Sequence, residues 1–464
     1  MFNSSTTVPS DHKASNPPLT NHVVVDRAPM AWGLRILIWV MACVPPVVFV
    51  YFFLTYSVNA PWSDDFDAIL GFLNGFFPDN RLDAVFSLTR LHNEHRIVLT
   101  RFLAWGNAML LGHVSFTALT VIANSSLFFL AGMLVYSGRQ VGLQNFWLIP
   151  IPCLILACQD NSNMLIAMYG LQNLVVHAFA AAAFLTWNHQ RILSALFGIL
   201  AVCTSSCGLL VFPIMTAFEI YAVLALDQGK FTAGTRQRLL RQASFPFALS
   251  VIIWGLYFWG YQSPPHHPSL LTGLMIPHRF LQYIVLLIGS PLVRFGHPMT
   301  HVIGLGFLCL LGFVLWKTDW RRHAAIVCLI LFELGTMFII ASARCGFGSG
   351  HPYNTRYRII SLTLWACTYL LASVWLLPHL KSSRIRTVGI AFASLAVAFN
   401  LLTARDSRAS FEILSHAINE QLTPQLAITK TIEDSERFYQ IAVESESKGL
   451  FHWPYLHTPA SSGK

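Results

Sequence analysis

The sequence predicts an all-α, polytopic membrane protein, folded as a bundle of about eleven transmembrane helices. Of its 464 residues, 55% are hydrophobic and only 11% are charged, and the mean hydropathy is +0.55. Several apolar runs reach the roughly 20 residues that a helix needs to cross a hydrocarbon core. The basic residues lie mainly in short loops between these runs. The net charge of +9 therefore indicates membrane orientation rather than nucleic-acid binding.

The chain begins with a polar segment, residues 1–31, that is rich in Ser, Pro and Asn. It lacks the basic start and cleavage site of a secretory signal, so we expect a disordered cytoplasmic tail. The first span is expected at 34–56, with a kink at Pro45 and Pro46. Basic residues precede this span, which predicts that the N-terminus is cytoplasmic and that the following loop lies outside.

A transmembrane domain is expected over 32–403, including a long outer loop at 57–113. Within that loop, 97–111 is apolar but short, which favours a juxtamembrane helix and leaves a crossing open. A helical tail at 404–464 is expected on the extracytoplasmic side, because its apolar residues have helical spacing. The remaining spans are expected at 114–136, 146–158, 173–188, 192–204, 208–227, 244–262, 301–317, 323–343, 359–378 and 387–403.

The loops between these spans test the arrangement, because every second loop should be basic. Basic residues do fall in alternate loops, which places the C-terminal tail outside. Residues 278–292 would break this register if they crossed, so we expect them to lie along or dip into the outer face. The residues that fix the register are Arg139, Arg191, Lys230, Arg236, Arg238, Arg241, Lys317, Arg321, Arg322, Lys381, Arg384 and Arg386.

The same register collects the unusual polar residues on the outer face. Ionisable groups this close to a bilayer cost free energy unless they are solvated or paired, so their clustering indicates a functional site. The loop around 344–358 is basic on the side where basic residues are disfavoured, and an anionic ligand would explain that. The candidate site residues are Asp64, Asp65, His92, Glu94, His95, Arg96, Gln159, Asn161, Gln172, Arg344, Arg356, Tyr357 and Arg358.

These residue types suit transfer from a lipid phosphate. A carboxylate can remove a proton from an acceptor hydroxyl, and arginines can hold a phosphate as negative charge grows on it. A sugar carried on a polyprenyl phosphate meets both demands, because its tail needs the bilayer while its head lies at the interface.

The Asp64-Asp65 pair just after the first span resembles the signature of the GT-C superfamily of membrane glycosyltransferases. The stretches Gln159–Gln172, Ser205–Leu210 and Asn354–Trp365 are similar to uncharacterised bacterial members of that type. The resemblance extends over most of the first 400 or so residues. It implies a GT-C-like fold and an inverting glycosyltransferase of the bacterial inner membrane, with the active site facing the periplasm or exterior.

The resemblance also implies a role for the Asp pair. Asp64 or Asp65 would be the general base, with a slight preference for Asp65. The acceptor would be a glycan, a lipid or a protein of the cell envelope. Residue type and position, rather than the resemblance, select the other candidates. The candidate substrate-binding residues are His92, Glu94, His95, Arg96, Gln159, Asn161 and Gln172, and the candidate lipid-phosphate-binding residues are Arg344, Arg356, Tyr357 and Arg358.

No cofactor is required by these patterns. His92 and His95 would share a face of a helix, which leaves a divalent cation open, but a third ligand at a diagnostic spacing is missing. Most of the nine cysteines lie in apolar tracts, and they predict neither a disulfide framework nor a zinc site.

Structural and functional alternatives accompany this hypothesis. The Asp pair can cap a helix, the arginines can extend toward the interface, and Gln159 and Asn161 can cap the following helix. His177 and Glu333 are expected to be packed inside the bundle. Two other functions stay open: a transporter or flippase of an anionic lipid-linked substrate, and a membrane transferase of acyl or phosphoryl-alcohol groups.

Overall fold

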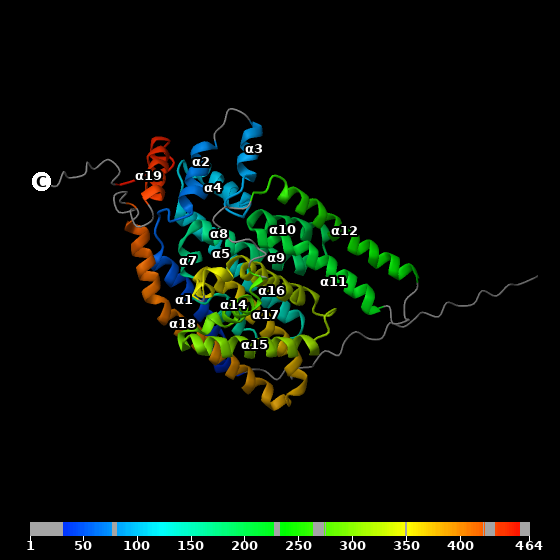
Figure 1. Ribbon diagram of the computed structural model, residues 1–464. Helices are drawn as coiled ribbons and strands as arrows, with labels where there is room; N and C mark the ends of the chain where they lie inside the picture. The colour runs from blue at the N-terminus through cyan, green and yellow to red at the C-terminus, as the bar shows by residue number, and fades with distance from the viewer. Residues whose placement is uncertain are drawn as a thin grey trace, which may run out of the picture.

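The computed structural model describes residues 31–76, 81–226, 233–262, 273, 275–348, 350–420, 422 and 432–454. Every regular element of this part is a helix, which confirms the all-α class (Figure 1). The N-terminal tail, apart from residue 31, lies outside the described residues.

Eight helical segments in the described part are long and apolar enough to cross a membrane. The chain is therefore a multi-pass membrane protein. The segments comprise α1 (Trp32–Tyr56), α5 (Phe116–Gln140), α8 with α9 (Ala167–Asn173 and Val175–Thr186), η3 with α11 (Ser206–Leu210 and Val211–Leu226), α15 (His297–Lys317), α16 (Ala324–Arg344), α17 (Arg358–Leu376) and α18 (Ser382–Glu420).

Three of the spans expected from the sequence are not among these eight. The segment at 146–158 is broken into η2 (Asn145–Trp147) and the six-residue α6 (Pro150–Ile155). The helix α10 (Arg191–Thr204) has 14 residues and is only about 21 Å long. The helix α12 (Ala233–Phe258) is long enough, but polar residues dilute its apolar stretch. The sequence alone hides these differences, because apolar content does not report where a helix breaks.

Two segments whose crossing of the membrane was left open by the sequence form short helices. Residues 97–111 become α4 (Val98–Leu111), and 278–292 become α14 (Pro277–Gly289) followed by a 3-10 turn. Each helix is about 20 Å long, which is less than the thickness of a hydrocarbon core. Both are therefore too short for a simple perpendicular crossing.

The outer loop and the C-terminal part of the chain form a layer at one end of the bundle. The short helices α2 (Phe72–Gly75) and α3 (Arg81–Thr89) lie there with α4 and α19 (Ile432–Ser447) (Figure 1). Phe66 stacks on Phe438 of α19, with 4.6 Å between ring centroids. The helix α18 continues unbroken through the boundary expected at 403/404, so that boundary is not a break in the structure.

Buried asparagine side chains donate hydrogen bonds to backbone carbonyl groups where helices break inside the bundle. The amide of Asn400 in α18 donates to the carbonyl of Cys153 at the end of α6 (3.0 Å). The amide of Asn124 in α5 donates to the carbonyl of Met164 in α7 (Asn161–Leu165) at 2.9 Å. An unpaired carbonyl at this depth would cost several kcal/mol. These bonds therefore stabilise the broken segment from α6 to α8.

The 3-10 turn η3 depends on close contact with α10. A Cβ atom on Gly208 would lie 2.3 Å from the carbonyl carbon and oxygen of Ala201 and 2.5 Å from the backbone nitrogen of Val202. These neighbours are backbone atoms of a helix and cannot move aside cheaply. Gly208 thus permits η3 to pack directly on α10.

We expect Gly208→Ala to lower the free energy of unfolding by at least about 2 kcal/mol, because the added methyl group must separate η3 from α10. The matched control is Gly255→Ala in α12, where a Cβ atom would meet nothing within 4 Å. Thermal unfolding of the detergent-purified chain measures both. Equal melting temperatures for Gly208→Ala and the wild type would contradict the packing described.

Candidate functional site

The clustered polar residues come from four separate parts of the chain that meet beside the outer layer. They are the segment after α1, a tight turn at 92–96, the α7–α8 junction, and the connection between α16 and α17. If this turn were helical, His92 and His95 would share one face. Instead, His92 and His95 exchange two backbone hydrogen bonds of 2.8 and 3.0 Å, and Asn93 has a φ of 50°. Asparagine tolerates this left-handed conformation, so the sequence suits the turn.

Asp65 is a buried anchor. Its side chain is 1% exposed, and its two carboxylate oxygens accept hydrogen bonds from the backbone nitrogens of Met168 (2.8 Å) and Trp62 (3.0 Å). Burial raises the pKa of Asp65 to about 7, although these two hydrogen bonds oppose the rise. Asp65 therefore holds the segment after α1 against the start of α8.

Asp64 is more accessible than its neighbour and lies within electrostatic range of His92, Tyr169 and Arg356. His92 is mostly buried, and its Nε2 atom has no hydrogen-bond partner among the described residues. Burial lowers the pKa of His92, although the charge of Asp64 opposes that effect. Asp64 is thus the carboxylate of the pair that a substrate could reach.

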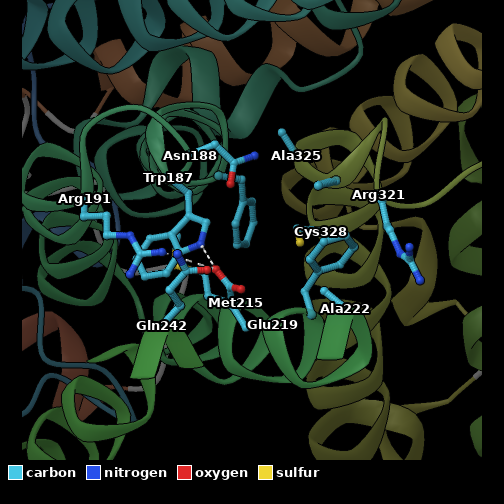
Figure 2. Close-up of a pocket in the computed structure, with 13 residues that line it drawn as sticks. Trp187, Asn188, Arg191, Met215, Glu219, Ala222, Gln242, Arg321, Ala325 and Cys328 are labelled. Carbon is cyan, nitrogen blue, oxygen red and sulfur yellow. Dashed lines mark hydrogen bonds and ion pairs between the residues drawn. The ribbon is translucent and has the colours of Figure 1, made fainter. Parts of the chain in front are cut away.

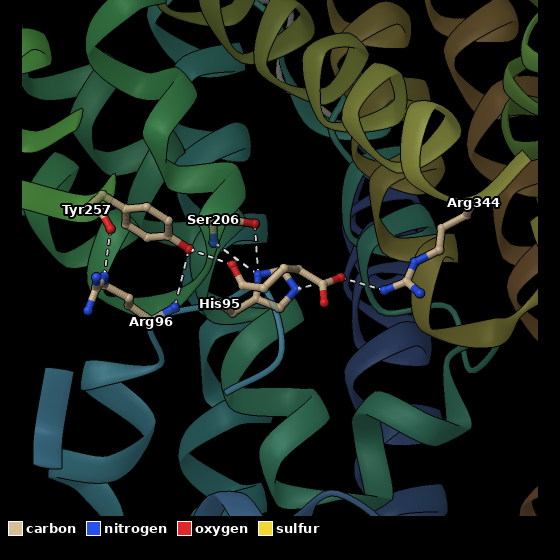
Figure 3. Close-up of polar contacts among 6 residues, drawn as sticks. His95, Arg96, Ser206, Tyr257 and Arg344 are labelled. Carbon is tan, nitrogen blue, oxygen red and sulfur yellow. Dashed lines mark hydrogen bonds and ion pairs between the residues drawn. The ribbon is translucent and has the colours of Figure 1, made fainter. Parts of the chain in front are cut away.

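Glu94 and Arg344, which are 250 positions apart, form an ion pair at the same end of the bundle (Figure 3). A guanidinium nitrogen of Arg344 lies 2.5 Å from Oε1 of Glu94. The same carboxylate oxygen is 3.6 Å from Nε2 of His95. This contact links the first outer loop to the C-terminal end of α16.

His95 connects the turn to η3. Its Nδ1 atom lies 2.8 Å from the hydroxyl oxygen of Ser206, as Figure 3 shows. Burial lowers the pKa of His95 to about 4, and the nearby Glu94 only partly offsets this. His95 is therefore neutral near pH 7, and its Nδ1 can accept the Ser206 hydroxyl proton. Sequence reasoning did not select Ser206, because a serine in an apolar run carries no local signal of this partner.

Arg96, a candidate substrate-binding residue, contacts protein groups in the structure. Its guanidinium donates to the backbone carbonyl oxygens of Tyr257 (2.7 Å), Thr89 (2.6 Å) and Trp259 (2.5 Å). Its backbone nitrogen also donates to the hydroxyl of Tyr257, which appears beside it in Figure 3. We interpret Arg96 as a positioning residue that attaches the outer loop to the end of α12.

Arg356, in the connection between α16 and α17, lies close to two tyrosine rings. Its guanidinium carbon is 5.0 Å from the ring centroid of Tyr357 and 5.6 Å from that of Tyr169. Its Nε atom is buried without a hydrogen-bond partner among the described residues. Both rings lie within cation–π distance of the guanidinium, and the unused donor suits an anion from outside the chain.

The α6–α7 junction holds the other predicted residues in protein contacts. The amide of Gln159 donates to the carbonyl of Pro291 (3.1 Å), and that of Asn161 donates to the carbonyl of Ser410 (3.0 Å). Arg358 donates to the carbonyl oxygen of Gln159 (3.1 Å), and Gln172 is buried. We interpret these four residues as supports of the site rather than as ligand contacts.

Asp160 and His351 complete the surroundings, and His351 was not selected from the sequence. Burial raises the pKa of Asp160 to about 7, although the amide of Asn163 donates to it at 2.9 Å. Burial and the charges of Arg356 and Arg344 lower the pKa of His351 to about 4. The ring of His351 also contacts Tyr283, whose hydroxyl lies 2.8 Å from Nδ1.

Metal ligands do not gather at this site. Among the described residues there is no group of three His, Cys, Asp or Glu side chains that could hold an ion.

We expect the stability of the chain to depend on the protonation of His95. Its folded pKa of about 4 is below the ordinary histidine value of about 6.5, so the contribution of the neutral ring is present above pH 6.5 and is lost as the pH falls toward 4. The contribution is at most about 3 kcal/mol. His95→Asn keeps an acceptor for Ser206 and should flatten this loss, as measured by thermal unfolding in detergent from pH 7 to 4.

The control for this measurement is His189→Asn, at an exposed position outside the site. This variant should follow the wild-type curve. If His95→Asn and the wild type lose the same stability between pH 6.5 and 4, then His95 is not a buried neutral group.

Comparisons with protein-family models, curated proteins and solved structures found no match to this chain, so its function is argued from the site geometry.

Proposed function

We propose that the chain is a membrane glycosyltransferase of the inverting, GT-C-like type. It would transfer a sugar from a polyprenyl-phosphate donor to a glycan, lipid or protein acceptor of the cell envelope. The observation that carries the proposal is that Asp64 lies within electrostatic range of Arg356, and that Glu94 pairs with Arg344, at one end of an apolar bundle. A carboxylate, two arginines and a bilayer side by side match the chemistry of a lipid phosphate donor.

Asp64 is the proposed general base. It is partly exposed, whereas both oxygens of Asp65 are held by backbone nitrogens. An acceptor hydroxyl must come within about 3 Å of the base, and this requirement favours the accessible carboxylate. Asp65 is then a positioning residue that fixes the backbone next to the base.

Arg356 is the proposed phosphate ligand. Its guanidinium is stacked between Tyr169 and Tyr357 and keeps an unused donor at Nε. A phosphate bound there would receive a charge-assisted hydrogen bond, and its leaving charge would be stabilised as the sugar departs. Arg344 lies on the same side but is already paired with Glu94, so a phosphate would compete with that carboxylate.

One observation favours the alternative function, a transporter or flippase of an anionic lipid-linked substrate. His177 and Glu333 lie within two candidate spans, 2% and 0% exposed, with 2.9 Å between Nδ1 and Oε1. The interior hydrogen bond agrees with the packed positions expected from the sequence. Ionisable pairs inside a bundle are also common in proton-coupled transporters.

The lead proposal predicts that Asp64→Asn lowers sugar transfer by about 100-fold or more, because the general base is lost. The measurement is the amount of surface glycan made by cells that carry each variant at equal protein abundance. The control is Asp83→Asn, an exposed residue of the same loop. Asp65→Asn should lower protein abundance as well, since it disturbs two backbone contacts. Normal glycan at normal abundance in Asp64→Asn would exclude the proposed base.

The alternative makes a different prediction for Glu333→Gln. The glutamine amide can keep the contact with His177, but it cannot take up or release a proton. A flippase should move a fluorescent polyprenyl phosphate across proteoliposomes, and Glu333→Gln should stop that movement. A transferase should leave surface glycan unchanged in Glu333→Gln. If the fluorescent lipid does not cross the membrane in proteoliposomes that contain the wild-type chain, the flippase function is excluded.

A further inference from the structure

A chain of polar contacts joins two candidate spans through the outer loop. Ser206 is the first residue of η3, which continues into α11, and Arg344 is the last residue of α16. His95 and Glu94 of the 92–96 turn lie between them (Figure 3). The imidazole contacts the Ser206 hydroxyl at Nδ1, and its Nε2 lies 3.6 Å from the same oxygen of Glu94 that pairs with Arg344. The ring of His95 is therefore the central member of this chain.

The Nδ1 side of His95 faces two groups of Ser206. The backbone nitrogen of Ser206 lies 3.4 Å from Nδ1, and the hydroxyl oxygen lies 2.8 Å from it. A backbone N–H can only donate a hydrogen bond, so it requires a lone pair on the nitrogen that it faces. A proton on Nδ1 would point at the backbone N–H. Nδ1 is therefore the acceptor, and the hydroxyl of Ser206 donates to it as well.

The single ring proton must then be on Nε2. His95 is neutral near pH 7, because burial lowers its pKa to about 4 and the charges of Arg344 and Arg356 act in the same direction. A neutral imidazole has one N–H. Nε2 faces the carboxylate of Glu94, which attracts an N–H and repels a lone pair. The contacts on both sides of the ring thus select the same tautomer.

A second carboxylate of the chain has the same kind of neighbours. Oε1 of Glu219, at the cavity shown in Figure 2, accepts a hydrogen bond from the indole nitrogen of Trp187 at 2.7 Å. The same oxygen lies 3.8 Å from a guanidinium nitrogen of Arg191. An indole nitrogen is always a donor. With a proton on Nε2 of His95, Glu94 likewise lies between a ring N–H and a guanidinium.

The packing of η3 fixes the donor that faces the ring. Gly208 permits η3 to pack directly on α10, as described above. The backbone nitrogen of Ser205 donates to the carbonyl of Ala201 at 3.1 Å, and that of Gly208 donates to the carbonyl of Ser205 at 2.9 Å. Which nitrogen of a histidine carries the proton is set by the hydrogen bond that the other nitrogen makes. The bundle therefore imposes the tautomer on the outer loop.

From these contacts we propose that Ser206 is a positioning residue, which holds His95 as the Nε2–H tautomer and so makes the imidazole a second donor toward Glu94. The consequence for the reaction rests on the proposed function. The contact between Glu94 and Arg344 lies on the side where the lipid phosphate binds, and the fixed ring holds that contact in one geometry. Loss of the Ser206 hydroxyl weakens donor binding and leaves the base, Asp64, in place.

The tautomer is measured by solid-state NMR of the full chain in phosphatidylcholine bilayers, with isotope-labelled histidine. The chain has 18 histidines, and the His95 ring is identified by the signals that disappear in His95→Asn. Correlation with Cγ distinguishes Nδ1 from Nε2. At pH 7 we expect Nδ1 of His95 in the chemical-shift range of an unprotonated ring nitrogen and Nε2 in the protonated range. A protonated Nδ1 in the wild type would overturn the proposal.

Two substitutions isolate the role of the hydroxyl. Ser206→Ala removes the closer donor at Nδ1, so signals of both tautomers should appear, whereas Ser206→Thr keeps a hydroxyl and should give the wild-type spectrum. The matched control is Ser125→Ala, which removes an exposed hydroxyl of α5 that donates to the carbonyl of Val121. Its spectrum should equal that of the wild type. An unchanged His95 tautomer in Ser206→Ala would refute the positioning role. Melting temperatures verify that each variant is folded.

The kinetic effect is measured by varying the concentration of the polyprenyl-phosphate sugar. Ser206→Ala should raise KM by about three- to tenfold with kcat unchanged, because one neutral hydrogen bond is lost outside the reacting groups. Ser206→Thr should restore the wild-type KM. A lower kcat at unchanged KM in Ser206→Ala would contradict a positioning role in donor binding. If the wild-type chain transfers no sugar, the proposed function fails, and the spectra still decide the tautomer.

Discussion

The need to satisfy backbone polar groups away from water shapes the whole bundle. Most of its helices pair their backbone groups through their own hydrogen bonds. The segment from α6 to α8 is broken, so some of its carbonyl groups need partners from other elements. Asn124 and Asn400 donate to the carbonyls that the breaks leave open. Asn163 does the same at the candidate site, where its amide donates a hydrogen bond to the backbone carbonyl of Arg356 at 2.9 Å. The non-helical backbone that carries the polar cluster thus exists because amides from neighbouring elements support it.

A second constraint concerns charge. Each arginine near the outer layer must be solvated, paired or bonded to carbonyl groups. Arg96 is bonded to three carbonyl oxygens and Arg344 is paired with Glu94, whereas Arg356 is stacked on aromatic rings and keeps a free donor. Arg96 and Arg344 thus have protein partners, whereas one donor of Arg356 has none among the described residues. The same reasoning distinguishes Asp64 from Asp65.

The sequence predicted the features that depend on composition and charge. Apolar runs predicted a membrane protein, which the eight long apolar helices support. The alternation of basic loops predicted that the Asp64 loop and Arg344 lie on one side, and the ion pair between Arg344 and Glu94 of that loop agrees with this. It could not predict which helices break, since α6 and α10 are as apolar as full spans. It also left open whether 92–96 is helical, because a spacing of three residues fits a helix or a turn. Partners such as Ser206 and Tyr257 are more than 100 positions away, and spacing carries no trace of them.

The continuous helix α18 has a mechanical consequence. Its 39 residues make a rod about 58 Å long, almost twice the thickness of a hydrocarbon core. Beyond the expected boundary it is clamped to α1, where Phe411 meets Phe52 at 5.1 Å, and to Arg294 through Asp406 at 2.8 Å. A rod fixed in this way ties the residues beyond the expected boundary to the membrane-crossing part of the bundle. Because its length is constant, it can match a thicker bilayer only by leaning less, which lifts its outer end.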